Sequence, residues 1–190
     1  MSNVNGKYLK DENNQAFSPI VSPFTVVMGG GGQPLSNKLE YASLTSLGGN
    51  LTYNLQGGFA KQVVNTSNYW AYPYNRFLVN NGDGQSIGVK QGVGTLHAKI
   101  EAFATIASSI AREVYLGIAI DASNENISAE AYVTTTYDVP ISNIYVCNPF
   151  IELHGGEKIR LFVYSNNPGN VSIERNASIS KVGIIVTGIY

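Results

Sequence analysis

A two-residue alternation of apolar and polar side chains runs through the segment "TLHAKIEAFATI", residues 95–106. The apolar set falls on every second position: Leu96, Ala98, Ile100, Ala102, Ala104 and Ile106. Successive side chains of a β-strand point to opposite faces, so this spacing places the whole set on one face of a strand. The segment therefore predicts a long strand with one face in a core.

The same period returns in "EVYLGIAID", "NISAEAYVTTTYD", "EKIRLFVYS" and "SISKVGIIVTGIY". The side chains expected to point inward are Val114, Leu116, Ile118, Ile120, Ile127, Ala129, Ala131, Val133, Ile159, Leu161, Val163, Ile184 and Val186. Turn-type segments such as "NNGDG", "HGGE" and "NNPGN" separate these runs. Many short alternating strands, with no convincing amphipathic helix between them, predict an all-β fold: an antiparallel jelly-roll sandwich.

Composition excludes several classes of function. The net charge is −1 and no basic run occurs, which argues against binding to nucleic acid. No apolar run approaches 18 residues, so membrane insertion is not expected, and the N-terminus lacks the pattern of a signal peptide. Cys147 is the single cysteine, so no intramolecular disulfide is possible, and we expect a small buried thiol. Synthesis in a cytoplasm follows as the expectation.

The first third of the chain has a different character. "GKYLKDENNQAFSPI" reads as a small hairpin, with a polar turn between two short extended arms. "MGGGGQP", residues 28–34, has four successive glycines and predicts a flexible linker. We therefore expect an N-terminal attachment segment over residues 1–27, a linker and short neck over 28–57, and a jelly-roll head over 58–190.

The neck leaves two alternatives open. Its apolar and small residues recur at helical spacing at Leu35, Leu39, Ser43 and Leu47. Pro34 is able to open a helix and Gly48 to end one. An irregular neck packed against other chains accounts for the residues 34–47 equally well.

No constellation of catalytic residues assembles in the sequence. His97 and His154 are not at metal-ligand spacing from each other or from Cys147, and no G-x-S-x-G motif is present. The carboxylates that a glycosidase would need lie on different predicted strands: Glu101, Glu113, Asp121 and Glu130. "NGDG", residues 81–84, has the chemistry of a turn rather than that of a calcium loop. We expect no enzymatic activity, no cofactor and no metal.

The densest aromatic segment is "NYWAYPYNRF", residues 68–77. Its candidate contact residues are Tyr69, Trp70, Tyr72 and Tyr74. Flat amphipathic rings at a surface stack on sugars, and Tyr and Trp are also enriched where protein chains meet. The segment therefore predicts contact either with a ligand or with a neighbouring protomer.

The head resembles the jelly-roll heads of the tumour-necrosis-factor and complement globular-head superfamily. The resemblance covers roughly residues 58–190 and includes a strand motif and a short apolar final strand. The motif consists of Ile151, Leu153, Gly156, Glu157, Lys158, Ile159, Leu161 and Val163. This resemblance implies a homotrimer of ten-stranded jelly rolls, with binding on outer faces or in crevices between protomers.

The opening stretch resembles the leading segments of bacteriophage fibre and baseplate proteins. The residues that carry this likeness are Tyr8, Leu9, Lys10, Asp11, Phe17, Pro19 and Ile20. Residues 28–57 depart from the pattern, because they are few and show no collagen-like or heptad repeat. The departure favours a stubby spike or head fibre over a long fibre.

Together, the two resemblances imply a structural virion protein. They imply a homotrimer exposed on the particle surface, with its head outward and a host cell-surface glycan as the candidate ligand. The N-terminus would dock to a capsid, collar or baseplate protein. The predicted virion-anchor residues are Tyr8, Leu9, Phe17, Pro19 and Ile20. The alternative is a carbohydrate-active enzyme or a lectin module on the same fold.

Overall fold

The chain forms two compact units, Met1–Leu39 and Glu40–Tyr190. The computed structural model describes residues 9–10, 16–17, 39–58, 61–71, 73, 75–92, 94–121, 127–136, 138, 140–174 and 181–189. In the first unit, β1 (Leu9–Lys10) pairs antiparallel with β2 (Ala16–Phe17), with Leu9 opposite Phe17. This pairing confirms the predicted N-terminal hairpin, although each arm is only two residues long.

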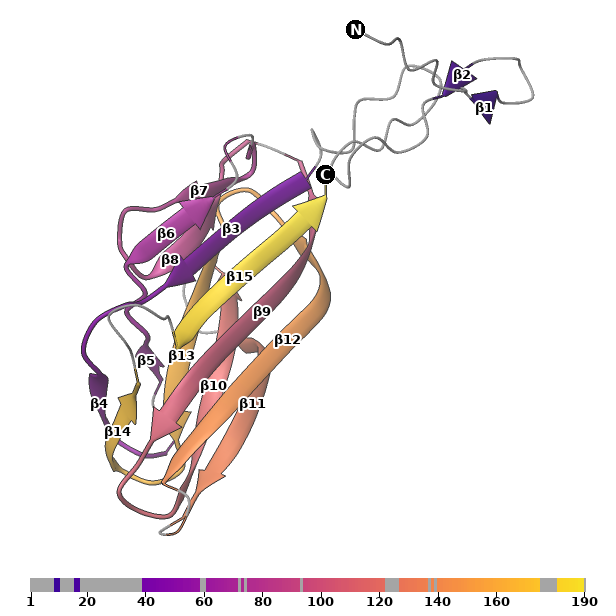
Figure 1. Ribbon diagram of the computed structural model, residues 1–190. Helices are drawn as coiled ribbons and strands as arrows, with labels where there is room; N and C mark the ends of the chain where they lie inside the picture. The colour runs from indigo at the N-terminus through magenta and orange to yellow at the C-terminus, as the bar shows by residue number, and fades with distance from the viewer. Residues whose placement is uncertain are drawn as a thin grey trace, which may run out of the picture. The chain divides into compact units, whose positions relative to one another are not determined.

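The second unit is a sandwich of two antiparallel sheets (Figure 1). The seven-stranded sheet contains β3 (Leu39–Thr45), β4 (Leu51–Leu55), β6 (Asn68–Ala71), β9 (Leu96–Ala107), β12 (Ile141–Leu153), β14 (Gly169–Ile173) and β15 (Val182–Ile189). Its order is β4-β14-β9-β15-β3-β6, and β12 pairs with β9. The last strand of the chain therefore lies inside the sheet, between β9 and β3, as Figure 1 shows.

The six-stranded sheet has the order β11-β10-β13-β8-β7, and β5 also pairs with β13. Its strands are β5 (Gln62–Val63), β7 (Leu78–Asn80), β8 (Ser86–Val89), β10 (Arg112–Asp121), β11 (Ile127–Thr135) and β13 (Lys158–Ser165). Several neighbouring strands, such as β9 with β15 and β10 with β13, come from distant parts of the sequence, as in a jelly roll. The predicted fold class, an all-β antiparallel jelly-roll sandwich, is confirmed.

The core lies between the sheets and includes many of the side chains that the alternation placed inward. In β9 all six predicted side chains are buried, and in β10 and β13 the inward positions from Val114 to Ile118 and from Ile159 to Val163 are buried as well. Ile127 departs from the prediction. The pairing of β10 with β11 shifts register between Ile118 and Ala119, and Ile127 packs on the outer side of the sheet with Ala119.

The predicted neck is wrong for the part that the structure describes. Residues 39–45 form a strand rather than a helix, and residues 51–55 form another. Ala42 and Leu44 are buried in the core of the sandwich together with Leu55. Because the apolar residues of β3 face the sheet core at alternate positions, tertiary packing overrides the helical spacing of the leucines. The head thus begins at about residue 39, not at residue 58.

The "NGDG" turn joins β7 to β8, as predicted. Gly82 and Gly84 adopt positive φ angles of 72° and 64°, which glycine tolerates without steric cost. Asp83 Oδ1 accepts hydrogen bonds from the backbone N–H groups of Gln85 and Ser86 at 2.9 and 2.8 Å. Burial alone would raise the pKa of Asp83, but the hydrogen bonds from Ser86 and Gln85 outweigh it, and the pKa is lowered.

A buried carboxylate joins the two sheets at one edge of the sandwich. Glu40 of β3 is fully buried. Its Oε1 accepts a hydrogen bond from the backbone N–H of Arg76 at 2.7 Å, and its Oε2 accepts bonds from Phe77 and Leu78 at 3.0 Å each. Leu78 begins β7 of the opposite sheet. Glu40 therefore accepts hydrogen bonds from three successive backbone N–H groups where the chain crosses between the sheets.

We predict that Glu40→Gln lowers the free energy of unfolding by about 1–3 kcal/mol, because the amide has one acceptor oxygen instead of two and leaves at least one of the three N–H groups facing a donor. Urea unfolding at one fixed protein concentration measures the change. Glu152→Gln is the matched control, since Glu152 is about half exposed, and we expect a change of less than about 0.5 kcal/mol there. Equal midpoints for the two variants would contradict this role for Glu40.

Candidate functional site

The outer face of the seven-stranded sheet collects exposed apolar side chains. Eight large hydrophobic residues are exposed in the described part of the chain, and five of them lie on this face: Trp70, Ile141, Tyr145, Phe150 and Ile189. Together with Tyr41 and Phe103, which alternate with buried residues on β3 and β9, they define what we call the aromatic face. A concentration of this kind on one side of a domain indicates a contact surface.

The middle of the aromatic face is a row of three residues on adjacent strands. Tyr145 of β12 lies opposite Phe103 of β9, which lies opposite Gly183 of β15. A Cβ atom at Gly183 would come within 3.0 Å of Phe103 Cζ, within 2.9 Å of Thr45 Cγ2 and within 3.1 Å of the Leu44 carbonyl oxygen. The ring of Phe103 therefore lies close over the glycine, whose lack of a side chain leaves room for it.

A polar network crosses the same region. Lys99 Nζ lies 2.9 Å from Glu101 Oε1, and the Tyr145 hydroxyl donates a hydrogen bond to the same carboxylate. The hydrogen bonds from Lys99 and Tyr145 lower the pKa of Glu101, and the bond to Glu101 raises the pKa of Tyr145. The ring of Tyr145 is thus held in place by its hydroxyl, while 56% of the residue remains exposed.

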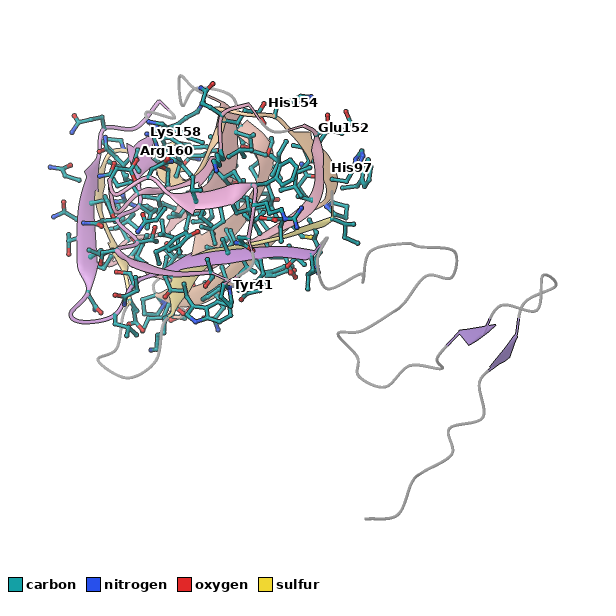
Figure 2. All side chains as sticks on the ribbon, turned by 90° about the horizontal axis from the view of Figure 1, so that it is seen from above. Tyr41, His97, Glu152, His154, Lys158 and Arg160 are labelled. Atoms are coloured by element: carbon teal, nitrogen blue, oxygen red, sulfur yellow. The ribbon has the colours of Figure 1, made fainter. Side chains whose placement is uncertain are left out.

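A β-bulge shapes one end of the aromatic face. The register of β12 against β9 shifts between Asn148 and Ile151. Phe150 consequently points outward, is 68% exposed, and stacks on the imidazole of His97 at 5.6 Å. Glu152 Oε1 lies 3.7 Å from His97 Nδ1. Figure 2 shows His97 and Glu152 together at one side of the sandwich.

The other end is formed by Trp70 on the outermost strand, β6. Its ring meets the ring of Tyr41 at a centroid distance of 5.2 Å and an interplanar angle of 73°, an edge-to-face pair. Backbone groups of Tyr41 are held by Asn75, whose Oδ1 accepts from Tyr41 N at 3.0 Å and whose Nδ2 donates to Tyr41 O at 2.6 Å. Trp70 is 58% exposed, so one large aromatic surface remains open to a partner.

Open hollows interrupt the aromatic face. One open hollow of about 370 Å³ is lined by side chains of Phe103, Thr105, Asn143, Tyr145 and Lys181. Thr105 Oγ1 donates to Asn143 Oδ1 at 2.8 Å across it. Within the described residues, no three His, Cys, Asp or Glu side chains gather as a metal site would require. The geometry is that of a broad contact surface.

The structure separates the aromatic residues that the sequence grouped together. Trp70 points outward, whereas Tyr69 packs against the core and is only partly buried there. Burial, with a smaller effect from Glu40, raises the pKa of Tyr69. Tyr72 and Tyr74 lie outside the described residues. Of the four candidates, Trp70 is therefore the one that the structure places on an open surface.

The predicted anchor residues belong to the other unit. Leu9 and Phe17 are paired across β1 and β2, whereas Tyr8, Pro19 and Ile20 lie outside the described residues. No helix among the described residues has the length and hydropathy needed to cross a membrane.

Sequence reasoning missed most of the aromatic face. Tyr41, Tyr145 and Phe150 were not singled out, although Tyr145 alternates with the inward residues Ile144 and Val146. The sequence does carry a signal for these residues: a large aromatic side chain stands where the alternation predicts a polar, outward-facing one. Cys147 also lies on this outer face. It is half-buried, whereas the sequence predicted a buried thiol.

Comparison with known proteins shows the fold. No family profile matches the chain, and no curated protein sequence matches it. A structure of murine APRIL at pH 5.0 is similar, with a TM-score of 0.56 and 10% identity over 80% of this chain and 100% of that one. A second murine APRIL structure, at pH 8.5, has a TM-score of 0.54 and 9% identity. The Eiger TNF structure from S. frugiperda has a TM-score of 0.50 and 10% identity over 94% of that chain. The head thus has a tumour-necrosis-factor-like jelly-roll fold.

We predict that Gly183→Ala lowers the free energy of unfolding by about 1–3 kcal/mol, because the added methyl group meets the Leu44 carbonyl and the Phe103 ring. Gly49→Ala is the matched control, since a Cβ atom there has no heavy atom within 4 Å. Thermal or urea unfolding of both variants measures the difference. If Gly183→Ala unfolded with the same free energy as the wild type, β9 and β15 would be less tightly packed around Gly183 than the structure shows.

Proposed function

We propose that this chain is the protomer of a homotrimeric phage spike or head fibre, whose heads associate through the aromatic face. The observation that carries the proposal is the concentration of exposed apolar residues there, five of the eight in the described part of the chain. A monomer would leave this surface in water at a cost that association removes. A closed threefold assembly buries the same patch on every protomer and leaves no open end.

The chemistry of the aromatic face suits a protein partner. Tyrosine and tryptophan are enriched at protein interfaces because they combine apolar area with a polar atom at one end. The face presents Trp70, Tyr145 and Phe150 around a polar network that is already satisfied within the chain by Lys99 and Glu101. Association therefore leaves few polar groups without a partner.

We propose three chains in the assembly because the head resembles those of the trimeric tumour-necrosis-factor superfamily. The shared fold supports this choice. The virion assignment is supported by the likeness of "GKYLKDENNQAFSPI" to phage fibre segments. We propose that residues 1–27 dock on a capsid, collar or baseplate protein, with Leu9 and Phe17 among the contacts. Short strands such as β1 and β2 are able to add to a sheet of the partner.

On such a particle the head faces outward, and we propose a host cell-surface glycan as its ligand and a non-catalytic role for the chain. A lectin module or a carbohydrate-active enzyme on the same fold is the alternative. Release of reducing sugar from host polysaccharide by the purified protein would favour the enzyme.

The association is tested by sedimentation of the full chain. We predict a mass about three times the 20.4 kDa of one chain. The variant Trp70→Glu/Phe150→Glu should sediment as a monomer, because each carboxylate would be buried without a partner at the interface. Tyr132→Glu, a change at a similarly exposed aromatic residue of the opposite sheet, should remain a trimer. A wild-type monomer at micromolar concentration would contradict the proposal.

The attachment is tested by assembly of particles with truncated protein. A chain that lacks residues 1–27 should still form trimers but should be absent from purified particles, because three weakly docking segments act together on each spike. Gly30→Ser/Gly31→Ser in the linker is the control and should be incorporated normally. Normal incorporation of the truncated chain would refute the attachment role while leaving the trimer intact.

A further inference from the structure

A row of three tyrosines crosses the outer face of the six-stranded sheet. Tyr132 of β11 lies opposite Tyr115 of β10, which lies opposite Tyr164 of β13. The ring centroids of Tyr132 and Tyr115 are 5.4 Å apart, and those of Tyr115 and Tyr164 are 5.2 Å apart with an interplanar angle of 7°. We call Tyr132, Tyr115 and Tyr164 the tyrosine row. It lies on the opposite sheet from the aromatic face.

Glycine at position 117 allows the row to reach a carboxylate two strands away. Gly117 lies opposite Glu130 on one side and Phe162 on the other. A Cβ atom at Gly117 would lie 3.3 Å from Tyr164 Cε1 and 3.1 Å from Ile127 Cδ1. The ring of Tyr164 therefore lies close over this glycine, and its hydroxyl donates a hydrogen bond to Glu130 of β11.

A second carboxylate flanks the row. Glu113 Oε2 accepts a hydrogen bond from the Tyr115 hydroxyl at 3.0 Å and another from Asn166 Nδ2 at 3.3 Å. The bond to Glu113 raises the pKa of Tyr115, and burial together with the bond to Glu130 raises the pKa of Tyr164. The phenols thus keep their protons and serve as donors to the two carboxylates.

Neither carboxylate has a cationic partner in the part of the chain that the structure describes. Among the described residues, no Lys, Arg or His nitrogen lies within 4.0 Å of Glu113 or Glu130. The five ion pairs of that part of the chain involve other acidic residues. The tyrosine row therefore lies between two negative charges that meet only neutral hydrogen-bond donors.

The row is open at the end formed by Tyr132. This residue lies on β11, the outermost strand of the sheet, and is 60% exposed. One side of its ring meets Tyr115. Its hydroxyl makes no hydrogen bond to another described residue. Tyr132 thus offers a ring surface on the same face of the sheet as the two carboxylates, and its hydroxyl has no hydrogen-bond partner among the described residues.

We propose that the tyrosine row is a binding surface for an alkylammonium cation, such as a quaternary ammonium group. The negative quadrupole of an aromatic face attracts a cation, and the charges of Glu113 and Glu130 add to this attraction. An anionic group would be repelled by the same charges. A neutral apolar group would gain contact with Tyr132 but nothing from the carboxylates. Charge complementarity therefore selects the cation.

This surface does not depend on the proposed function. A trimer closed through the aromatic face would leave the six-stranded sheet at its periphery, so the row remains accessible in either state. Because the site is an open platform and not an enclosed cage, we expect a dissociation constant on the order of millimolar for the cation alone.

The test is a titration of the full-length protein with choline, followed by tyrosine resonances in NMR or by calorimetry. The uncharged isostere 3,3-dimethyl-1-butanol is the control ligand, because it has the same shape as choline without the charge. We expect choline to bind at least about fivefold more tightly than the alcohol, and its affinity to fall as salt is added. Equal affinity for both ligands would overturn the proposal.

Variants locate the site. Tyr132→Leu should weaken choline binding at least about fivefold, because it keeps apolar bulk but removes the π face. Tyr132→Phe keeps the ring and should bind within about twofold of wild type. Glu130→Gln keeps an acceptor for Tyr164 and should weaken binding and flatten its salt dependence. Circular dichroism confirms that each variant is folded. Unchanged binding by Tyr132→Leu, or the absence of choline binding by the wild-type protein, would refute the site.

Discussion

Backbone pairing along both edges of β9 is the constraint on which the sandwich depends. One edge pairs with β12 from Leu96 to Ala107, and the other pairs first with β15 and then with β14. Because the inward positions of β9 are all buried, a slip of one residue would turn six apolar side chains to the surface. The register of β9 therefore sets the register of its neighbours. It also brings the final strand of the chain next to β3, the first strand of the head.

β3 is held in its own sheet by pairing with β15 and β6, and a buried carboxylate also ties it to the other sheet. Glu40 holds the backbone at Arg76, Phe77 and Leu78, and so joins β3 to the start of β7 in the other sheet. A buried carboxylate is costly unless its oxygens are satisfied, and here three backbone donors satisfy them. The same contacts explain why the head extends about twenty residues further toward the N-terminus than the alternation indicates.

The two outer faces of the sandwich are chemically different, and the difference suggests a division of roles. The aromatic face is broad, and Glu101 near its centre is already paired with Lys99 and Tyr145. It suits burial against another copy of the chain. The tyrosine row is small, and its carboxylates lack cationic partners among the described residues. It suits a small cation at the periphery of an assembly.

The sequence by itself determined the fold class, the inward faces of β9, β10 and β13, and the N-terminal hairpin. These follow from a period of two and from turn residues, which are local properties of the chain. Only the tertiary structure decided that residues 39–45 form a strand, that Ile127 turns outward at a register shift, and that Trp70 points away from Tyr69. Both candidate surfaces also depend on it. Phe150 meets His97, and Tyr164 meets Glu130, through pairing between strands far apart in the sequence. Such pairings are set by sheet register, which local spacing does not specify.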